Sequence, residues 1–297
     1  MSNIMGVNAV ASIPFCEDGS VDYIGFETML EHLKQSGCHG ITLFGIASEF
    51  YKLTDTEKDK LARLFILSLS KKNIYSCLSV TQHSTEVAVK QAQNYESLGA
   101  NALMVLPPFF LNPTIGQILE HIFSILDNVS IPTLIQYAPT ETGLVISEED
   151  MAKISEQYPH SVFKIECQDP VKYSQKLLEY APNAIILNGY AGLYMIDILS
   201  IGGKAVMPGC SFVEIYVEIY RLYFEDKEKA KQLHQHLFSY IQKWMSHPEY
   251  IIQIEKEILK QRGIINSSYC RRPACLLQES DFSDIKLFLQ EFKGFLT

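Results

Sequence analysis

The hydrophobic and polar positions of the first 224 residues follow two periods that alternate along the chain. Short runs of apolar and β-branched residues are typical of buried strands, whereas apolar residues that recur every three or four positions are typical of one helix face. Strands are predicted at residues 7–13, 40–44, 74–80, 102–106, 133–137, 162–165, 185–187 and 205–207. Helices are predicted at residues 23–36, 56–70, 85–98, 115–126, 148–157, 171–179, 193–199 and 212–223.

Eight strand–helix units with short connections predict an α/β fold, in which parallel strands close into a (β/α)8 TIM barrel. An open, doubly wound sheet is the alternative, and it is disfavoured because no Gly-x-Gly-x-x-Gly segment follows the first strand. Residues 225–297 are predicted to be helical, at 227–244, 250–261 and 282–296. We therefore expect a barrel over residues 1–224 and a C-terminal helical subdomain over residues 225–297, which packs on the barrel or provides an oligomer contact.

Several of the predicted helices begin with a capping signal. Thr54 precedes Glu57 by three residues, and Ser84 and Ser147 stand directly before helical stretches. Each side-chain oxygen is expected to accept a hydrogen bond from an otherwise unpaired N–H group of the first helical turn.

Composition and charge limit the classes of partner that the protein is expected to bind. Of the 297 residues, 47% are hydrophobic and 20% are charged, which is typical of a globular protein. A net charge of −9 gives no electrostatic support for binding nucleic acid or an anionic membrane, so we expect a small-molecule partner. Because no export signal or membrane segment is apparent, cytoplasmic residence is expected. The seven cysteines are scattered without a Cys-x-x-Cys pair, so neither a metal site nor disulfides are expected. No cofactor is predicted.

The candidate chemistry lies at the carboxyl ends of the predicted strands, where barrels of this kind hold their active sites. Lys164 interrupts the apolar sixth strand, and Asn188 and Gly189, which follow the seventh, are predicted to bind the substrate. Burial disfavours the ammonium form of a lysine and would leave a nucleophilic amine that can condense with a carbonyl. The alternative is a structural ion pair with Glu166, which lies two residues on and on the same face of a regular strand.

Short segments spread over nearly the whole chain carry a family resemblance. They lie at residues 6–10, 14–15, 18–22, 45–49, 53–57, 99–102, 107–110, 139–143 and 272–273. In combination, the chain resembles the dihydrodipicolinate synthase/N-acetylneuraminate lyase family of pyruvate-handling barrels. The resemblance implies a class I lyase or aldolase that acts on pyruvate or another 2-oxo acid. It also implies a homo-oligomer, either a tetramer or a dimer.

Counted without a gap from Pro139, Lys164 falls where the family has its Schiff-base lysine. If Glu166 lay close and ionised it would oppose attack by the amine, so it is expected to be neutral or turned away. The segment 45–49 falls where the family has Gly-Thr-Thr-Gly-Glu, so Ala47 and Ser48 are expected to hold the substrate carboxylate through backbone N–H groups and the Ser48 hydroxyl.

The chain departs from the family at the positions that move protons. The tyrosine that serves as proton shuttle at the end of the fifth strand falls at Gln136, and Tyr137 comes one residue later. Since one step along a strand reverses the face, either Gln136 lines the site and the phenol is missing, or an irregularity turns Tyr137 inward to act as the catalytic tyrosine. We favour Gln136. A second tyrosine of the family's relay falls at Phe109 or Phe110.

A further departure concerns the second substrate. The arginine with which the synthases hold a second carboxylate falls at Glu141, which would repel an acid and bind a hydroxyl or amine instead. The chain is therefore not expected to be an efficient dihydrodipicolinate synthase.

These departures from the family's residues leave two alternatives to a lyase function. A barrel that has kept its pocket but lost most turnover would serve as a small-molecule binding or regulatory protein. A metal-dependent aldolase or a phosphate-binding barrel is less favoured, because the sequence shows no ligand cluster and no Gly-rich phosphate loop.

Overall fold

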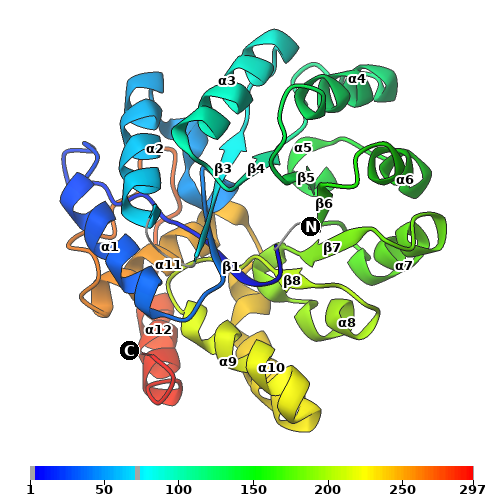
Figure 1. Cartoon of the computed structure of the whole chain (residues 1–297). Coiled ribbons are helices and arrows are strands. Elements are labelled where there is room, and N and C mark those ends of the chain that lie inside the picture. The colour runs from blue at the N-terminus through cyan, green and yellow to red at the C-terminus, as the bar shows by residue number, and fades with distance from the viewer. Residues whose placement is uncertain (1–3, 71–73, 297) are drawn as a thin grey trace. The chain divides into compact units, whose positions relative to one another are not determined.

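Eight parallel strands form a closed barrel in chain order, from β1 to β8, in a computed structural model that describes residues 4–70 and 74–296 (Figure 1). The strands are β1 (Gly6–Val10), β2 (Gly40–Leu43), β3 (Tyr75–Val80), β4 (Ala102–Val105), β5 (Thr133–Tyr137), β6 (Ser161–Ile165), β7 (Ile185–Asn188) and β8 (Ala205–Val206). The predicted α/β class and the (β/α)8 barrel are thereby confirmed.

The helices follow the strands in the predicted order. They are α1 (Tyr23–Gln35), α2 (Asp55–Leu69), α3 (Thr85–Leu98), α4 (Ile115–Leu126), α5 (Pro139–Thr142), α6 (Glu148–Gln157), α7 (Pro170–Tyr180), α8 (Met195–Ser200), α9 (Val213–Glu225), α10 (Lys227–Trp244), α11 (Pro248–Gln261) and α12 (Glu279–Glu291). Short 3-10 turns follow β2 and β7, as η1 (Ile46–Ser48), η2 (Phe50–Lys52) and η3 (Tyr190–Gly192). Among the described residues no helix is long and apolar enough to cross a membrane.

The chain divides into two compact units. Unit one contains residues 75–207, with β3 to β8 and α3 to α8, together with the described residues 4 and 5. Unit two contains residues 6–70, residue 74 and residues 208–296, with β1, β2, α1, α2 and α9 to α12. The boundary expected near residue 224 remains a prediction, and residues 1–3, 71–73 and 297 of the predicted domains lie outside the described residues.

The strand register of unit one decides which side chains share a face. β5 and β6 pair in parallel with Gln136 opposite Lys164 and Tyr137 opposite Ile165, and β6 and β7 pair with Ile165 opposite Asn188. Paired residues of neighbouring strands point to the same side of a sheet, and successive residues alternate. Gln136 and Lys164 therefore share one face, whereas Tyr137 and Asn188 share the other.

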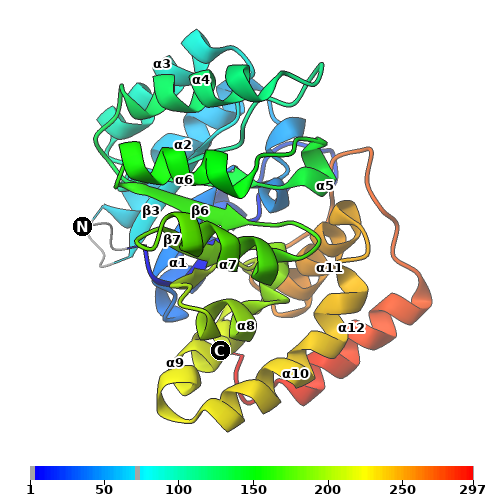
Figure 2. The same ribbon diagram turned by 90° about the vertical axis from the view of Figure 1, so that its right-hand side faces the viewer.

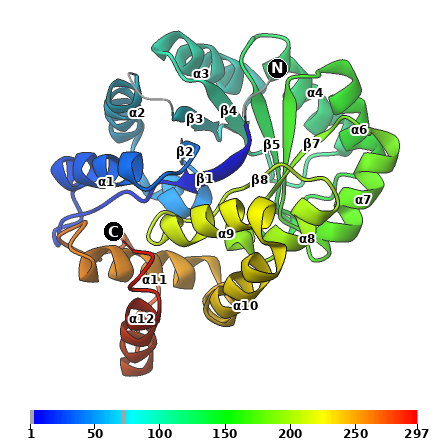
Figure 3. The same cartoon turned by 60° about the horizontal axis from the view of Figure 1, so that its bottom comes forward.

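The C-terminal helices of unit two pack through aromatic side chains. α9 and α10 are neighbours (Figure 3), and α10 lies beside α12 (Figure 2). Trp244 of α10 and Phe288 of α12 are both fully buried, with their ring centroids 5.1 Å apart in an edge-to-face arrangement. Burial of such rings contributes about 1.5–3 kcal/mol each, so these helices form a core of their own.

The local predictions differ from the structure at a few helix ends. Thr54 and Ser147 cap α2 and α6 as expected, by accepting from the N–H groups of Glu57 and Asp150. The cap predicted at Ser84 is wrong, because its hydroxyl instead donates to the Glu86 carboxylate at 2.8 Å. The third C-terminal helix covers Glu279–Glu291, not 282–296, and α5 was not predicted.

Candidate active site

Lys164 lies at the carboxyl end of β6 with its side chain almost entirely withdrawn from solvent. Its ammonium nitrogen is 3.1 Å from Oε1 of Glu166, which is itself buried. An unpaired buried ammonium group would be strongly destabilising, so this carboxylate is what makes a buried lysine possible here.

Three donors hold the Glu166 carboxylate in place. Besides Lys164, the Gln136 amide donates to Oε2 at 2.6 Å, and the backbone N–H of Tyr190 donates to Oε1 at 3.1 Å. The expectation that a nearby Glu166 is turned away is wrong, because the Gln136 amide and the loop after β7 hold it against the lysine.

Gly189, a predicted substrate-binding residue, makes room for this carboxylate. A Cβ atom at position 189 would lie 2.2 Å from Oε1 of Glu166, which no side chain could accommodate without a shift. The two residues that follow, Tyr190 and Ala191, have φ angles of 45° and 48°, in the left-handed region that is unfavourable for residues with a side chain. The loop after β7 thus takes a costly conformation that lets its backbone reach Glu166.

Gln136, not Tyr137, is the β5 residue that lies beside the lysine. The Gln136 side chain is buried and bonded to Glu166. The Tyr137 ring stacks on Tyr173 of α7, with centroids 4.6 Å apart, so it lies on the helix-covered face of the sheet. β5 is regular through both residues, so no irregularity turns the phenol towards Lys164. This geometry gives no support to the predicted catalytic role of Tyr137.

Asn188 also lies away from the lysine. The β6–β7 register places it on the face of Ile165, and its side-chain oxygen accepts from the N–H of Tyr194 at 3.3 Å. The geometry therefore favours a role in holding the start of α8 over the predicted contact with substrate.

Glu141 belongs to α5, the single turn that follows β5. Its Oε2 atom is buried and has no hydrogen-bond partner among the described residues. Burial raises the pKa of Glu141 to about 7, the negative charge of Glu166 adds to the rise, and the positive charge of Lys164 opposes it. Glu141 is therefore close enough to both groups to feel their charges, and it changes protonation state near neutral pH.

In unit two, the predicted carboxylate-binding segment forms the turn η1. The Ser48 hydroxyl donates its proton to the Ala11 carbonyl at 2.6 Å, and the Ser48 N–H donates to the Gly45 carbonyl at 2.9 Å. Both donors of Ser48 are thus engaged within the protein, which does not favour the predicted use of this hydroxyl to bind substrate. The carboxylate-binding role of Ala47 stays a prediction.

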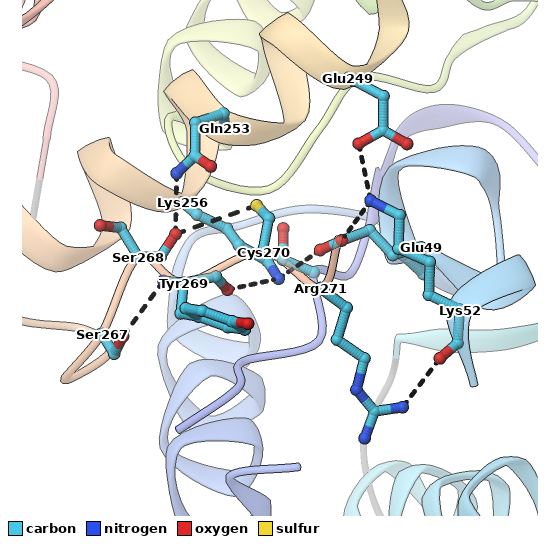
Figure 4. A network of polar contacts seen from close by, with 12 residues as sticks. Glu49, Lys52, Glu249, Gln253, Lys256, Ser267, Ser268, Tyr269, Cys270 and Arg271 are labelled. Atoms are coloured by element: carbon cyan, nitrogen blue, oxygen red, sulfur yellow. Dashed lines mark hydrogen bonds and ion pairs between the residues drawn. The ribbon is translucent and has the colours of Figure 1, made fainter. Parts of the chain in front are cut away.

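A buried network of charges supports this segment (Figure 4). Glu49 follows η1 in the left-handed conformation, with φ 52° and ψ 35°, and is fully buried. Its carboxylate pairs with Lys52 at 3.0 Å and with Lys256 of α11, which is also fully buried. Lys256 donates to the Tyr269 carbonyl at 3.2 Å and lies 4.2 Å from the centroid of the Phe15 ring. The network fixes the backbone of residues 45–52.

Sequence reasoning missed this network as well as the contacts of Tyr190. Lys256 stands between Glu255 and Glu257 on a helix, a pattern that usually marks a solvated face, yet all three are buried. Tyr190 acts mainly through its backbone N–H, which any residue type would supply.

The described part of the chain contains no group of three or more His, Cys, Asp or Glu side chains placed to hold a metal ion. That no metal or cofactor is needed remains a prediction.

Comparison with known proteins agrees with this fold. The model of the dihydrodipicolinate synthetase family matches residues 3–291. A 4-hydroxy-tetrahydrodipicolinate synthase from Hydrogenobaculum sp. is 26% identical over 94% of this chain and 95% of its own length.

Two solved structures have the same fold. The 4-hydroxy-tetrahydrodipicolinate synthase from the methanotroph Methylacidiphilum fumariolicum SolV is 26% identical with a TM-score of 0.88, covering 99% of this chain and 97% of its own. A prophage protein of the dihydrodipicolinic acid synthase family from E. coli K12 was solved in complex with pyruvate. It is 20% identical with a TM-score of 0.88, covering 100% of this chain and 100% of its own, and at this identity the likeness shows the fold alone. With the family model matched over nearly its whole length, the chain belongs to the dihydrodipicolinate synthetase family.

Proposed function

We propose that this protein is a Schiff-base lyase or aldolase that acts on pyruvate or another 2-oxo acid, with Lys164 forming the iminium. Membership of the family supports a pyruvate-dependent lyase. The pyruvate complex of the E. coli protein supports the same class of substrate. The single observation that carries the proposal is the buried Lys164, paired with Glu166 at the carboxyl end of a barrel strand.

The ion pair supplies the proton transfers that an iminium requires. Lys164 passes one proton to Glu166 across their 3.1 Å contact, and the free amine attacks the carbonyl carbon of the 2-oxo acid. The resulting carbinolamine loses its hydroxyl as water when Glu166 returns the proton. The iminium cation that remains lies beside the restored carboxylate, which stabilises its charge.

The position of Glu141 supports a restriction on the second substrate. A synthase that condenses pyruvate with aspartate semialdehyde must hold a second carboxylate, and Glu141 offers no positive charge to bind it, whether protonated or not. We propose that the protein is not an efficient dihydrodipicolinate synthase. Consumption of aspartate semialdehyde should be slow compared with that of uncharged aldehydes, and rapid dihydrodipicolinate formation would contradict the proposal.

Trapping the iminium tests the main proposal. The protein is incubated with pyruvate, and with a panel of other 2-oxo acids, in the presence of borohydride, and the adduct is located by peptide mass spectrometry. We expect one adduct on Lys164, no adduct in Lys164→Arg, and an unchanged yield in Lys153→Arg, which alters an exposed lysine of α6. Absence of any adduct across the panel in the wild-type protein would refute the Schiff-base function.

A second candidate function is a small-molecule binding or regulatory barrel with little turnover. The observation that favours it is Gln136, because an amide stands beside the lysine where the family has a tyrosine, and an amide does not exchange protons near neutral pH. Saturable binding of a 2-oxo acid by calorimetry, without an adduct and without turnover, would establish this function instead.

The oligomeric state, the location in the cell and the domain boundary are further proposals. We propose a homo-oligomer, a tetramer or a dimer, which sedimentation velocity would detect. Cytoplasmic residence and the division near residue 224 are likewise expectations, which cell fractionation and limited proteolysis would test.

A further inference from the structure

The Schiff-base reaction needs a second proton carrier that the contacts described so far do not provide. Once the iminium has formed, a proton must leave the carbon next to it before an enamine can attack an acceptor. Gln136 cannot carry that proton because it is an amide, and the Tyr137 phenol lies on the other face of β5. Glu166 already holds three donors, including the nitrogen that becomes the iminium.

Glu141 is a further acid–base group of this cluster in unit one. It stands on the single turn after β5, five residues beyond Gln136 and within the electrostatic reach of both Lys164 and Glu166. Tyr190 of η3 also feels its charge, and the Tyr190 hydroxyl donates to Thr140 of the same turn at 2.8 Å. Glu141 is thereby surrounded by groups from β6, the segment after β6, and η3.

One carboxylate oxygen of Glu141 has no hydrogen-bond partner among the described residues. Oε2 is buried, and no donor among residues 4–70 and 74–296 is bonded to it. A buried polar atom without a partner costs about 1–3 kcal/mol, so such an atom calls for a water, an ion or a reacting group to complete its bonding. The unpaired Oε2 therefore leaves Glu141 able to accept a hydrogen bond or a proton from a group outside the chain.

We propose that Glu141 is a catalytic residue that carries the proton to and from the carbon next to the iminium, because β5 presents an amide and not a phenol on the face of the lysine. This inference rests on the Schiff-base function proposed above. The Glu141 carboxylate takes a proton from that carbon, and the electrons of the C–H bond form the C=C bond of the enamine. The C=N electrons pass to the nitrogen of Lys164 and neutralise its charge. Reprotonation of the carbon by Glu141 reverses the step.

The electrostatics of the site suit this role. A proton carrier works best when its pKa is close to the working pH, because both protonation states are then populated. Burial and the neighbouring Glu166 bring the pKa of Glu141 to about 7, well above the ordinary 4.5 of a glutamate. The charged groups that face it are Lys164, which favours the carboxylate, and Glu166, which disfavours it, while the nearby Tyr190 phenol has a pKa raised to about 12 and stays neutral.

Hydrogen–deuterium exchange separates this step from iminium formation. In D2O, each cycle from iminium to enamine and back replaces a methyl proton of pyruvate by deuterium, which proton NMR follows without a second substrate. Glu141→Gln keeps the size of the side chain and removes the carboxyl group. Glu141→Asp keeps the carboxyl group on a shorter side chain. Glu156→Gln changes an exposed glutamate of α6 as the matched control.

We expect the Glu141→Gln variant to form the borohydride adduct on Lys164 at the wild-type yield while its exchange rate falls by about 100-fold or more. Glu141→Asp should keep part of the exchange, and Glu156→Gln should keep all of it. In the wild-type protein the exchange rate should rise with pH through a midpoint near 7, since the carboxylate form accepts the proton. This rise should be lost in Glu141→Gln.

Three results would overturn the inference. The first is exchange at the wild-type rate in a Glu141→Gln variant that still forms the adduct. The second is a wild-type protein that forms the adduct but exchanges no methyl protons. The third is loss of the adduct in both the Gln and the Asp variants, which would place Glu141 at an earlier step. A wild-type protein that forms no adduct would instead refute the Schiff-base function.

Discussion

Replacing Glu214 by glutamine should lower the stability of unit two in a manner that depends strongly on pH. Glu214 lies in the first turn of α9 with only 6% of its side chain exposed. Arg262, equally buried, donates to both oxygens of its carboxylate, at 3.2 Å to Oε2 and through a second contact to Oε1. The ring nitrogen of His32 lies 3.1 Å from Oε1.

The magnitude follows from the acid constant of this carboxyl group. Burial by itself would raise its pKa, but the bonds from His32 and Arg262 outweigh burial and hold the pKa of Glu214 at about 2, compared with the ordinary 4.5. Each tenfold change in the constant corresponds to ~1.4 kcal/mol, so the ionised carboxylate contributes roughly 3 kcal/mol to the free energy of unfolding. The same variant leaves Arg262 beside a neutral amide, which adds to the loss.

Folding lowers the pKa of Glu214, and this direction decides how its contribution to stability depends on pH. Because the folded pKa is the lower one, the contribution is complete above about pH 4.5 and disappears as the pH falls towards 2. Glu214→Gln should therefore lose about 3 kcal/mol at pH 7 but only about 1.4 kcal/mol at pH 3. In a chain of this size the loss at pH 7 corresponds to a melting temperature lower by roughly 5–10 °C.

Calorimetry and urea titrations at pH 7, 5 and 3 measure this difference between the wild-type protein and Glu214→Gln. Glu218→Gln, which removes one of the two carboxylate partners of Arg221 on the same helix, is the matched control. It should lower the free energy of unfolding by less than about 1 kcal/mol, because this pair is more exposed. A loss for Glu214→Gln that is the same at pH 3 as at pH 7, or no larger than that of the control, would show that the ion pair does not supply this stability.

Three further changes test the candidate site and its support. Gln136→Ala should lower kcat/KM about tenfold or more by releasing Glu166, whereas Tyr137→Phe should have little effect on it. If steady-state kinetics show the larger loss for Tyr137→Phe, the Tyr137 phenol takes part in the reaction and this interpretation of the site is wrong. Gly189→Ala should displace the Glu166 carboxylate and reduce the borohydride adduct, and an unchanged yield would show that the close approach is dispensable. Lys256→Met should lower the free energy of unfolding, measured by urea titration, by about 3–5 kcal/mol, because it removes a cation from the buried Glu49 carboxylate. A decrease of less than about 1 kcal/mol would refute a stabilising role for this ion pair.

The fold could be predicted because it depends on periodicity, which the sequence displays directly. The ranges of β5, α3, α4, α6 and α10 agree with the prediction residue for residue. The first strand was predicted to extend to residue 13 but ends at Val10, although the Ala11 N–H still bonds to Thr42 at 2.8 Å. Hydrophobicity alone does not mark that end, because the apolar run continues as the backbone leaves the ladder.

The site could be predicted only in part, because each side chain's partner depends on atoms far away in the sequence. Lys164 stands out by itself, as a charge inside an apolar strand. The Gln136 amide and the Tyr190 N–H, which hold the Glu166 carboxylate, lie 30 and 24 residues from Glu166 along the chain.

The sequence by itself determined the order of strands and helices, the family resemblance and the position of the lysine, since these are read from local pattern and residue type. Only the tertiary structure decided what surrounds the lysine. The register of β5 against β6 places Gln136 and not Tyr137 beside it, and the loop after β7 turns the Tyr190 N–H towards Glu166. Burial likewise sets the pKa of Glu141, because the loss of solvent that raises it arises only when the strands and turns come together.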